Sequence, residues 1–425
     1  MAASLALVLL ALLGAPLFAI IGAGALLGFA RSGVELTAVP IEIYGIAETP
    51  ILLAIPLFTF AGYVLSESRA AARLVRLSAA LIGWLPGGLA MVAVATCSLF
   101  TAFTGGSGVT IIAIGALLFP ALVQAGYSER FTLGLVTSSG SLGLLFAPSL
   151  PLIIYGIIAE VSIDSLFVAG IVPGILMMLA VAAFCLLRNR ENRRPLADFS
   201  WREVRAAIRE SIWELPLPVV VLGGIYSGYF AVSEAAAVTV VYVLIVELLI
   251  YQEVPWRRIP GIVRESMVLV GGILLILGIS LASTNYMIDA QVPQQLIELV
   301  TSQISSQTSF LLLLVGFLLL IGCILHIFSA LVLVVPLMLP VAARYGVDPV
   351  HLGIIFVATM ELGYLLPPIG LNLYISSYRF RRPVLEVCIA TLPFILILFA
   401  AVLLITFVPA LSLALVPTSI QELQQ

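Results

Sequence analysis

The sequence predicts an all-α polytopic membrane protein, and three observations support this fold class. Hydrophobic residues make up 62% of the 425-residue chain and charged residues only 10%, whereas about a quarter of the residues in soluble proteins are charged. The mean hydropathy is +1.21. Apolar runs that approach or exceed the roughly 20 residues needed to span a bilayer recur along the chain. They are continuous, which does not fit the short alternating segments of a transmembrane β-barrel.

The elements follow from these runs in chain order. The N-terminal stretch 1–19 resembles a signal-peptide core but lacks a basic segment, so we expect the first apolar run, 5–30, to remain uncleaved. It forms either one tilted span or two short ones that break near residues 14–16. The later helical segments are expected at about 50–66, 84–103, 107–123, 131–156, 166–187, 214–232, 234–252, 266–287, 309–325, 328–343, 351–377 and 384–409.

Arginine placement predicts the orientation of these segments. The chain contains no lysine, and its arginines cluster at 188–209, with smaller groups at 69–76, 257–264 and 379–382. By the positive-inside rule these connections are cytoplasmic. The stretch 289–307 has no basic residue and is expected to be an external loop. On this path only Arg31 and Arg344 lie outside.

Two stretches of the chain carry the same unusual pattern of proline and glycine. The matched positions, each offset by 220 residues, are Pro120 and Pro340, Gly126 and Gly346, Gly143 and Gly363, and Pro148 and Pro368. On the arginine-based path the two stretches have opposite orientations, which predicts an inverted-topology repeat. The alternative is a pair of parallel spans in which proline and glycine coincide by chance.

This repeat divides the chain into three parts. We expect a first repeat at 1–187, a cytoplasmic connection at 188–213 and a second repeat at 214–425. Each repeat would contain scaffold helices, a re-entrant helical hairpin and a broken helix. The first hairpin, about 84–123, opens to the cytoplasm and precedes a broken helix at about 131–156. The second, about 309–343, opens to the outside and precedes a broken helix at about 351–377.

The tips of the two hairpins differ in composition. The first reads Gly105-Gly106-Ser107-Gly108, and irregular backbone at membrane depth is tolerated only beside protein or a water-filled cavity. Its carbonyl and hydroxyl oxygens are hard ligands that suit Na⁺, and a helix N-terminus there suits an anion. A small-residue packing face is the alternative. The second tip has only His326 and Ser329 as polar side chains, and His326 is either a packing residue, a ligand or a proton relay.

The broken helices contain further polar residues. Proline frees the carbonyl four residues before it, and the two segments contain Pro148 and the pair Pro367-Pro368. Kinked but continuous helices are the alternative. Glu361 lies within the second segment, where a carboxylate costs about 2.5–3.5 kcal/mol on insertion scales, so a functional role is its default interpretation. It either binds a cation, carries a proton or pairs with a hydroxyl.

Several other functions are not supported by the sequence. Four cysteines and two histidines without ligand spacing make a structural metal site unexpected. No phosphate-binding loop, HExxH motif or nucleophile elbow occurs, so we expect neither an enzyme nor a cofactor. The net charge of −3 gives no support for a nucleic-acid partner. The lipid bilayer is the one partner that composition requires.

Taken together, the motifs resemble the large membrane subunit of TRAP (tripartite ATP-independent periplasmic) transporters, the DctM-like family. The residues that carry the resemblance are Ile55-Pro56-Leu57-Phe58, Gly105–Gly115, Pro120–Gly126, Ser139–Gly143, Pro148–Pro151, Pro336–Pro340, Gly346–Gly353 and Leu366–Asn372. Three positions depart from the family pattern. Gly106 stands where Ser is frequent, His326 where an acidic residue is common, and Leu366 where Thr is frequent.

The resemblance implies a multi-pass protein of the bacterial inner (cytoplasmic) membrane that moves by an elevator mechanism. Its implied partners are a small four-helix membrane subunit and a periplasmic substrate-binding protein. The implied function is Na⁺-coupled import of an organic acid such as a C4-dicarboxylate or sialic acid. A stand-alone divalent-anion/Na⁺ symporter, or an H⁺-coupled antiporter that needs no binding protein, is the main alternative, and a membrane-embedded enzyme or assembly factor is the third.

From the residues and this resemblance we expect two Na⁺ sites and one substrate site. The first Na⁺ site would use Gly105, Ser107, Thr110, Ser139, Gly140 and Ser141. The second would use Ser329, Thr359, Glu361, Gly363 and Pro367. Thr104, Ser149 and Asn372 would face the substrate. Because each charge that crosses 100 mV changes the free energy by about 2.3 kcal/mol, electrically favourable entry needs at least two Na⁺ per monoanion or three per dianion.

Overall fold

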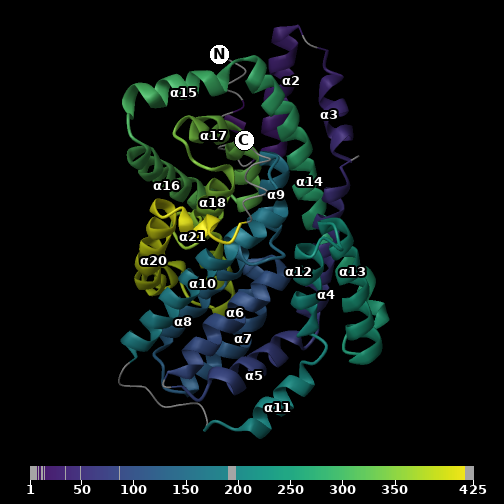
Figure 1. Cartoon of the computed structure of the whole chain (residues 1–425), viewed down its shortest axis with the longest axis vertical. Coiled ribbons are helices and arrows are strands. Elements are labelled where there is room, and N and C mark those ends of the chain that lie inside the picture. Colours follow the sequence, from purple (N-terminus) through teal and green to yellow (C-terminus); the bar gives the residue numbers. More distant parts are fainter. Residues whose placement is uncertain are drawn as a thin grey trace.

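The structure is a computed structural model, and the elements that it describes are helices (Figure 1). It describes residues 15–33, 35–47, 49–85, 87–189 and 198–416, together with Leu7, Leu9, Leu10 and Leu13. Within these residues eight helices are long and apolar enough to cross a membrane, or nine if one bent pair forms a single span. The expected all-α polytopic fold is therefore confirmed.

The helices divide into two series. The first comprises α2 (Leu17–Ser32), α3 (Ala38–Ala47), η1 (Pro50–Leu53), α4 (Ala54–Glu67), α5 (Ala70–Ile82), α6 (Gly88–Thr104), α7 (Ser107–Gln124), α8 (Glu129–Ser139), η2 (Leu142–Leu145), α9 (Leu150–Ala159) and α10 (Ile163–Arg188). After α11 (Trp201–Glu210), the second comprises α12 (Pro216–Tyr226), α13 (Val232–Leu244), η3 (Ile245–Ile250), η4 (Trp256–Arg258), α14 (Ile259–Asp289), α15 (Val292–Gln303), α16 (Gln307–Ile324), α17 (Ile327–Arg344), α18 (Pro349–Gly363), α19 (Leu371–Phe380), α20 (Val384–Phe407) and α21 (Ala410–Leu413).

The two series repeat the same succession of elements. Helices α5–α10 recur as α15–α20, and each counterpart begins within two residues of an offset of 220. The first hairpin, α6 and α7, lies in the lower half of Figure 1, whereas α16 and α17 lie in the upper half. The second arm of each hairpin packs against the far half of the other broken helix, α7 on α19 and α17 on α9. This confirms the inverted-topology repeat with two hairpins and two broken helices.

The matched glycines and prolines hold equivalent places in the two halves. Gly126 and Gly346 follow the second hairpin arms with positive φ angles of 90° and 70°, where glycine avoids the steric cost of a side chain. Pro120 and Pro340 lie inside α7 and α17. The 220-residue offset seen in the sequence therefore corresponds to a structural repeat whose two copies turn at equivalent positions.

The expectation of an external loop at 289–307 is wrong. The stretch 289–307 forms helix α15 at its centre, which lies across the top of the molecule (Figure 1) and packs against α17. Leu296, Ile297 and Val300 face the apolar core, and this spacing is that of one helix face. The amphipathic helix was missed because its apolar face is short and narrow. In the first run, α2 begins after Pro16, whose ψ of 134° is not helical, so the chain breaks there.

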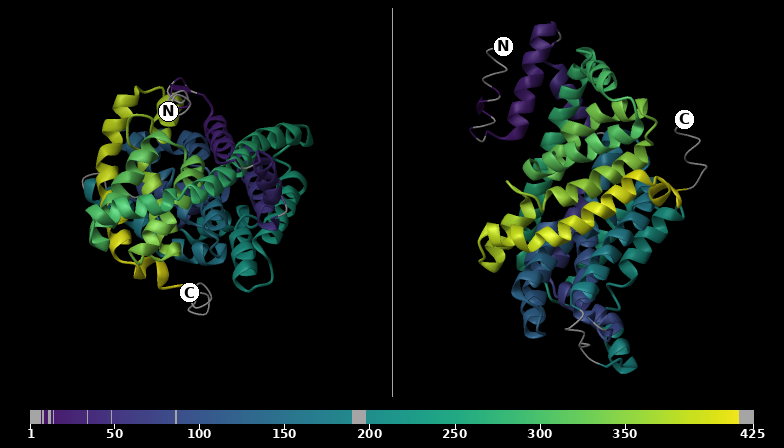
Figure 2. Two further views of the ribbon diagram at one scale, coloured as in Figure 1. Left: turned by 90° about the horizontal axis from the view of Figure 1, so that it is seen from above. Right: turned by 90° about the vertical axis from the view of Figure 1, so that its left-hand side faces the viewer.

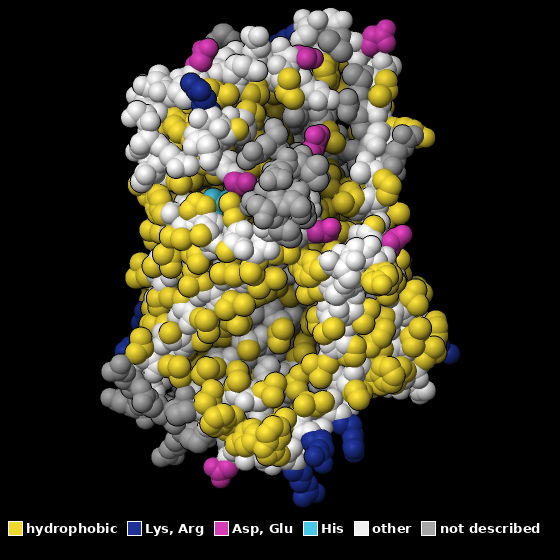
Figure 3. All heavy atoms as spheres, in the orientation of Figure 1, with side chains coloured by type: hydrophobic (Ala, Val, Ile, Leu, Met, Phe, Trp, Pro, Cys, Tyr) yellow, Lys and Arg dark blue, Asp and Glu magenta, His cyan; other side chains and the backbone are white. Residues whose placement is uncertain are grey.

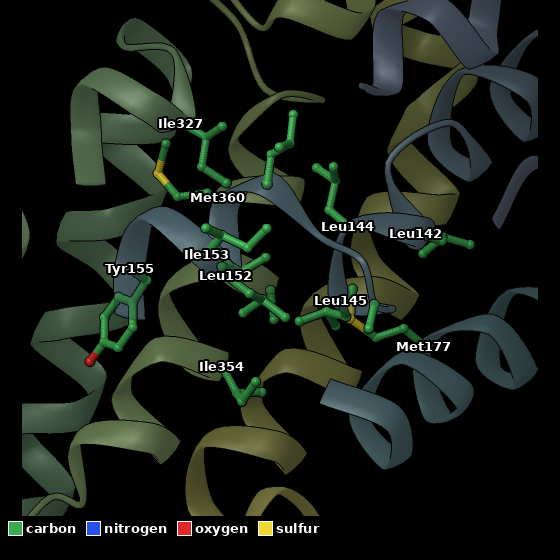
Figure 4. Close-up of a cluster of buried hydrophobic side chains, with 14 of the residues drawn as sticks. Leu142, Leu144, Leu145, Leu152, Ile153, Tyr155, Met177, Ile327, Ile354 and Met360 are labelled. Carbon is green, nitrogen blue, oxygen red and sulfur yellow. The ribbon is translucent and has the colours of Figure 1, made fainter. Parts of the chain in front are cut away.

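The core of the fold lies between the two repeats. Figure 4 shows Leu142, Leu144 and Leu145 of η2 beside residues of α9, with Ile327 of α17 and Met360 of α18 closing the cluster. At the edge of this core the Tyr155 hydroxyl donates a hydrogen bond of 2.6 Å to the carbonyl of Pro349. The two broken helices are thus packed against each other at the centre of the molecule.

The outer surface is consistent with a bilayer. Figure 3 shows a broad hydrophobic belt, with several Arg side chains at the lower end and acidic side chains mostly toward the upper end. Figure 2 shows α20 as one long inclined helix along a side of the molecule, where it packs against α8 and α10. The lower end therefore corresponds to the cytoplasmic side expected from the arginines.

Candidate functional site

The tips of the two hairpins meet at one cavity. Its volume is about 140 Å³. The lining residues come from both tips, from α4, from the broken helices and from α14: Tyr63, Thr104, Gly105, Gly106, Ser107, Gly108, Val109, Leu144, Leu150, Leu269, His326, Ile327, Phe328, Tyr364 and Leu371. Residues more than 200 positions apart in the chain therefore face the same space.

The first tip is a tight turn between two helices. Gly105 has a φ of +66° and ends α6, and α7 begins at Ser107. No side chain caps the start of α7, so the amide groups of its first turn can meet an anion. A Cβ atom at Gly105 would lie 2.9 Å from a side-chain carbon of Leu150. Backbone angle and space thus both favour glycine here.

The second broken helix contacts the first tip. The Ser107 hydroxyl donates a hydrogen bond of 2.8 Å to Oδ1 of Asn372. Both side chains are buried, and the Nδ2 group of Asn372 has no partner within the described part of the chain. A second link joins the broken helices, because the Thr137 hydroxyl donates to Ser376 Oγ at 2.8 Å. Ser107 and Asn372, expected in different sites, are therefore neighbours.

Behind this tip lies a chain of buried oxygen atoms. The Thr101 hydroxyl lies 2.6 Å from that of Thr110 and 2.7 Å from the carbonyl of Gly140, to which it donates. Ser139 Oγ is buried without a hydrogen-bond partner among the described residues. The Ser141 hydroxyl reaches only the Ser138 carbonyl, at 3.5 Å. Unpaired buried hydroxyls are costly, and a cation is one species that would satisfy such oxygen atoms.

The second tip is held by the second broken helix. The amide of Ile327, the first residue of α17, donates to the Tyr364 hydroxyl at 2.6 Å. The amide of Ile369 donates to the carbonyl of Cys323 at 3.2 Å. His326 is exposed at the tip, and its ring centre lies 4.9 Å from that of Phe328 and 5.8 Å from that of Tyr364.

The residues expected in the second Na⁺ site are only partly grouped. Glu361 is 1% exposed, and neither carboxylate oxygen has a hydrogen-bond partner among the described residues; the Thr359 hydroxyl is also unpartnered. Ser329 is buried at the start of α17. Gly363 packs on α16, where an added Cβ atom would lie 2.5 Å from Gly322. Pro367 is exposed in the break between α18 and α19.

In each broken helix, the carbonyl of the matched glycine before the prolines accepts an equivalent backbone hydrogen bond. The Gly143 carbonyl accepts from the amide of Phe146, and the Gly363 carbonyl accepts from that of Leu366, both at 3.1 Å. The peptide bonds that precede Pro148 and Pro368 are both cis. The protein itself thus satisfies part of the irregular backbone, as membrane depth requires.

Two of the three residues expected at the substrate have hydrogen bonds inside their own segments. The Thr104 hydroxyl donates to the carbonyl of Phe100 at 2.9 Å, although Thr104 lines the cavity. The Ser149 hydroxyl donates to the Leu144 carbonyl and accepts from the amide of Leu152, which caps α9. Substrate contact by these residues, and by Asn372, stays a prediction.

Sequence reasoning missed three residues of the site. Thr101 joins the hairpin to Gly140, Tyr364 joins the second tip to its broken helix, and Tyr63 brings α4 to the cavity. Thr101 lies one helical turn before Thr104 on α6, a spacing that could have identified it. The two tyrosines carry no motif, and only the packing of distant helices reveals them.

Comparisons with known proteins agree with this architecture. Residues 3–411 match the family described as "Tripartite ATP-independent periplasmic transporter, DctM component". The C4-dicarboxylate TRAP transporter large permease protein of Pseudomonas aeruginosa is 35% identical over 93% of this chain and 92% of its own length. An ectoine/5-hydroxyectoine TRAP transporter large permease protein of Ruegeria pomeroyi is 32% identical over 97% of both chains.

A solved structure shows the same fold at lower sequence similarity. The YdaH transporter of Alcanivorax borkumensis superposes with a TM-score of 0.65 and 16% identity, over 90% of this chain and 89% of that one. Two inverted halves around a central cavity define a multi-pass membrane transporter. The chain belongs to the DctM family of tripartite ATP-independent periplasmic transporters and is a large permease of that type.

Proposed function

We propose that this permease imports a small organic acid anion by Na⁺ symport across the bacterial inner membrane. The observation that carries the proposal is the cavity between two opposed hairpin tips, with buried oxygen atoms beside it that have no hydrogen-bond partner among the described residues. The similarity to a C4-dicarboxylate permease supports an organic acid as substrate. A periplasmic binding protein would deliver the substrate, and a small four-helix membrane subunit would complete the transporter.

The lining of the cavity supports recognition of an anion without a fixed cation. Among the described lining residues there is neither Lys nor Arg, and His326 is the one basic side chain. The negative charge would be met by amides at the start of α7 and by bound Na⁺. Hydroxyl groups near the first tip would add hydrogen bonds. His326 would lie close enough to the substrate to influence which acid fits.

Two groups of residues are candidates for holding Na⁺. The first is the buried oxygen network of Thr101, Thr110, Ser139 and the Gly140 carbonyl. The second is the pair Thr359 and Glu361, whose side-chain oxygens are buried and unpartnered in the described chain. An uncompensated carboxylate in a membrane interior is costly, and a bound cation would offset that cost.

Alternating access would follow the elevator pattern. The moving part would contain the hairpins and broken helices, α6–α9 and α16–α19, and the scaffold would contain α4, α13 and α14, of which α13 and α14 both pack against α4. Contact between the parts is close at Gly62 of α4, where an added Cβ atom would lie 2.8 Å from Thr104 Cα. The lack of a side chain at Gly62 lets the two parts approach this closely.

The test is uptake by proteoliposomes that contain this permease, its small subunit and its binding protein. Labelled C4-dicarboxylates and ectoine would be offered with Na⁺ or with K⁺ outside, at zero potential and at an inside-negative potential. We expect uptake that needs Na⁺ and the binding protein and that increases with the potential. Uptake that is indifferent to both Na⁺ and potential would reject the proposal.

One observation favours a second candidate, H⁺-coupled exchange. Glu361 is buried and has no hydrogen-bond partner in the part of the chain that the structure describes, and a carboxylic acid in such a place can carry a proton. In that case a pH gradient would drive uptake in Na⁺-free buffer. Uptake without the binding protein would further indicate a stand-alone carrier.

A further inference from the structure

A separate cavity opens far from the hairpin tips, at the cytoplasmic end of α8, α10 and α20. Its volume is about 510 Å³, more than three times that of the cavity at the tips. The walls are Gly126, Ser128, Arg130, Phe131, Phe184, Arg188, Asn189, Ile389, Ala390, Pro393 and Phe394. None of these residues takes part in the proposed transport site.

Two arginines, Arg130 and Arg188, line this cavity, and neither has a partner among the described residues. The described chain offers neither Arg130 nor Arg188 an ion pair or a hydrogen bond for its guanidinium. Glu129, the neighbour of Arg130 in the sequence, and Glu386 of α20 are both paired with Arg382. Among the described residues, the cavity therefore presents two positive charges without a counter-charge.

Arg130 occupies an unfavourable position for a purely structural residue. It is the second residue of α8, which begins at Glu129, and the positive end of the helix dipole disfavours a cation there. Ser128 caps the same helix by accepting from the amide of Phe131, and its hydroxyl hydrogen remains able to donate. A bound anion would offset both the dipole and the arginine.

The floor of the cavity is aromatic. The ring centre of Phe394 lies 5.6 Å from that of Phe131 and 5.1 Å from that of Phe184. Phe394 belongs to α20, and on the same helix Pro393 has no amide hydrogen to donate to the carbonyl of Ile389, four residues earlier. An apolar floor and two guanidinium groups thus border one space.

We propose that this cavity binds an anionic phospholipid of the inner leaflet, with its phosphate between Arg130 and Arg188 and an acyl chain along the three phenylalanines. Basic pockets between transmembrane helices on the cytoplasmic side suit such headgroups. Guanidinium groups bind phosphate oxygens in a bidentate manner. The aromatic floor would be superfluous for a free phosphate ion, which selects the lipid as the occupant. The Ile389 carbonyl can accept from a hydroxyl of a glycerol headgroup.

The proposal rests on the orientation of the chain in the membrane and not on its substrate. Lipid binding is therefore measured on the intact purified permease without any transport assay. Native mass spectrometry would compare phosphatidylglycerol with phosphatidylcholine, and inorganic phosphate would be added as a competitor. We expect one phosphatidylglycerol to remain bound, phosphatidylcholine to bind weakly, and phosphate at millimolar concentration not to displace the lipid.

The matched variants are R130Q/R188Q and R202Q/R209Q. The second pair removes the same charge from α11, where both arginines are exposed and lie on the same side of the membrane. At about 1 kcal/mol per basic residue near anionic lipid, the first pair should weaken phosphatidylglycerol binding about thirty-fold, and the second should leave it unchanged. R130K/R188K should retain intermediate affinity, which covers the case that the glutamine variant fails to fold.

Three results would overturn the proposal. Equal weakening by both double variants would mean general surface charge instead of a site. Equal affinity for phosphatidylcholine would remove the role of the headgroup charge. Displacement by phosphate would identify a free anion as the ligand.

Discussion

Replacing Arg73 with methionine should destabilise the protein strongly. Arg73 of α5 is 4% exposed and contacts three carboxylates: Glu214 through Nε, Glu253 through Nη1 at 2.6 Å and Glu247 through Nη2 at 3.3 Å. Its guanidinium also lies 4.0 Å from the centre of the Tyr251 ring. One buried cation thus joins α5 to the region just before α12 and to the end of the segment formed by α13 and η3.

The magnitude follows from burial. The side chains of Glu214 and Glu247 are 4% and 0% exposed, so R73M would leave negative charges in a protein interior without their counter-charge. Breaking a buried ion pair by removing one partner costs about 3–5 kcal/mol. This corresponds to a fall in the folded-to-unfolded ratio of about one hundred-fold to a few thousand-fold.

The assay is denaturant unfolding of the purified permease in detergent, followed by tryptophan fluorescence. The control is R76M, because Arg76 forms exposed ion pairs with Glu203 and Glu210, and exposed pairs contribute little. Adding E247Q to R73M should recover part of the lost stability by removing one uncompensated charge. Equal unfolding midpoints for R73M and R76M would refute the reasoning.

Three further predictions concern the transport site. Glu361→Gln should raise the Na⁺ concentration for half-maximal uptake, and an unchanged Na⁺ titration would remove Glu361 from the ion site. Ser107→Ala should raise the same Na⁺ concentration by about five-fold or more, since leaving the buried amide oxygen of Asn372 unpaired costs about 1–3 kcal/mol. An unaltered Na⁺ concentration would contradict the role of the first tip. Gly363→Ala should lower thermal stability and uptake, because its Cβ atom would lie 2.5 Å from Gly322. The control is Gly316→Ala, whose Cβ atom would meet nothing within 4 Å. Equal melting temperatures for the two variants would show that the helices can separate at no cost.

Much of the fold could be predicted from the sequence because it depends on local sequence patterns. Runs of apolar residues and the bias of arginine reflect contact with lipid and with the cytoplasmic surface, which each segment experiences by itself. The offset of 220 residues located both hairpins and both breaks, since Gly126 and Gly346 need positive φ angles in any such corner. Helix α15 was missed because its local apolar pattern is short and narrow, in a helix of 12 residues.

The site was harder to predict, since its residues come from separate segments. Polarity within an apolar span identified Ser107, Thr110 and Glu361 as unusual, but did not show which of them are neighbours. The hydrogen bond between Ser107 and Asn372 joins positions 265 residues apart, and no spacing rule connects them. Tyr364 was missed for the same reason, as a tyrosine in an apolar run is unremarkable until its hydroxyl meets a helix terminus.

The amino-acid sequence by itself determined that this chain crosses a membrane many times, in two inverted halves broken at proline and glycine, because these features depend on composition and on backbone sterics. Only the tertiary structure decided which oxygens remain unpaired, which aromatic rings close the cavity between the tips and where two arginines stand free above a phenylalanine floor. Those outcomes depend on contacts across hundreds of residues. Such contacts form when inverted halves pack against each other.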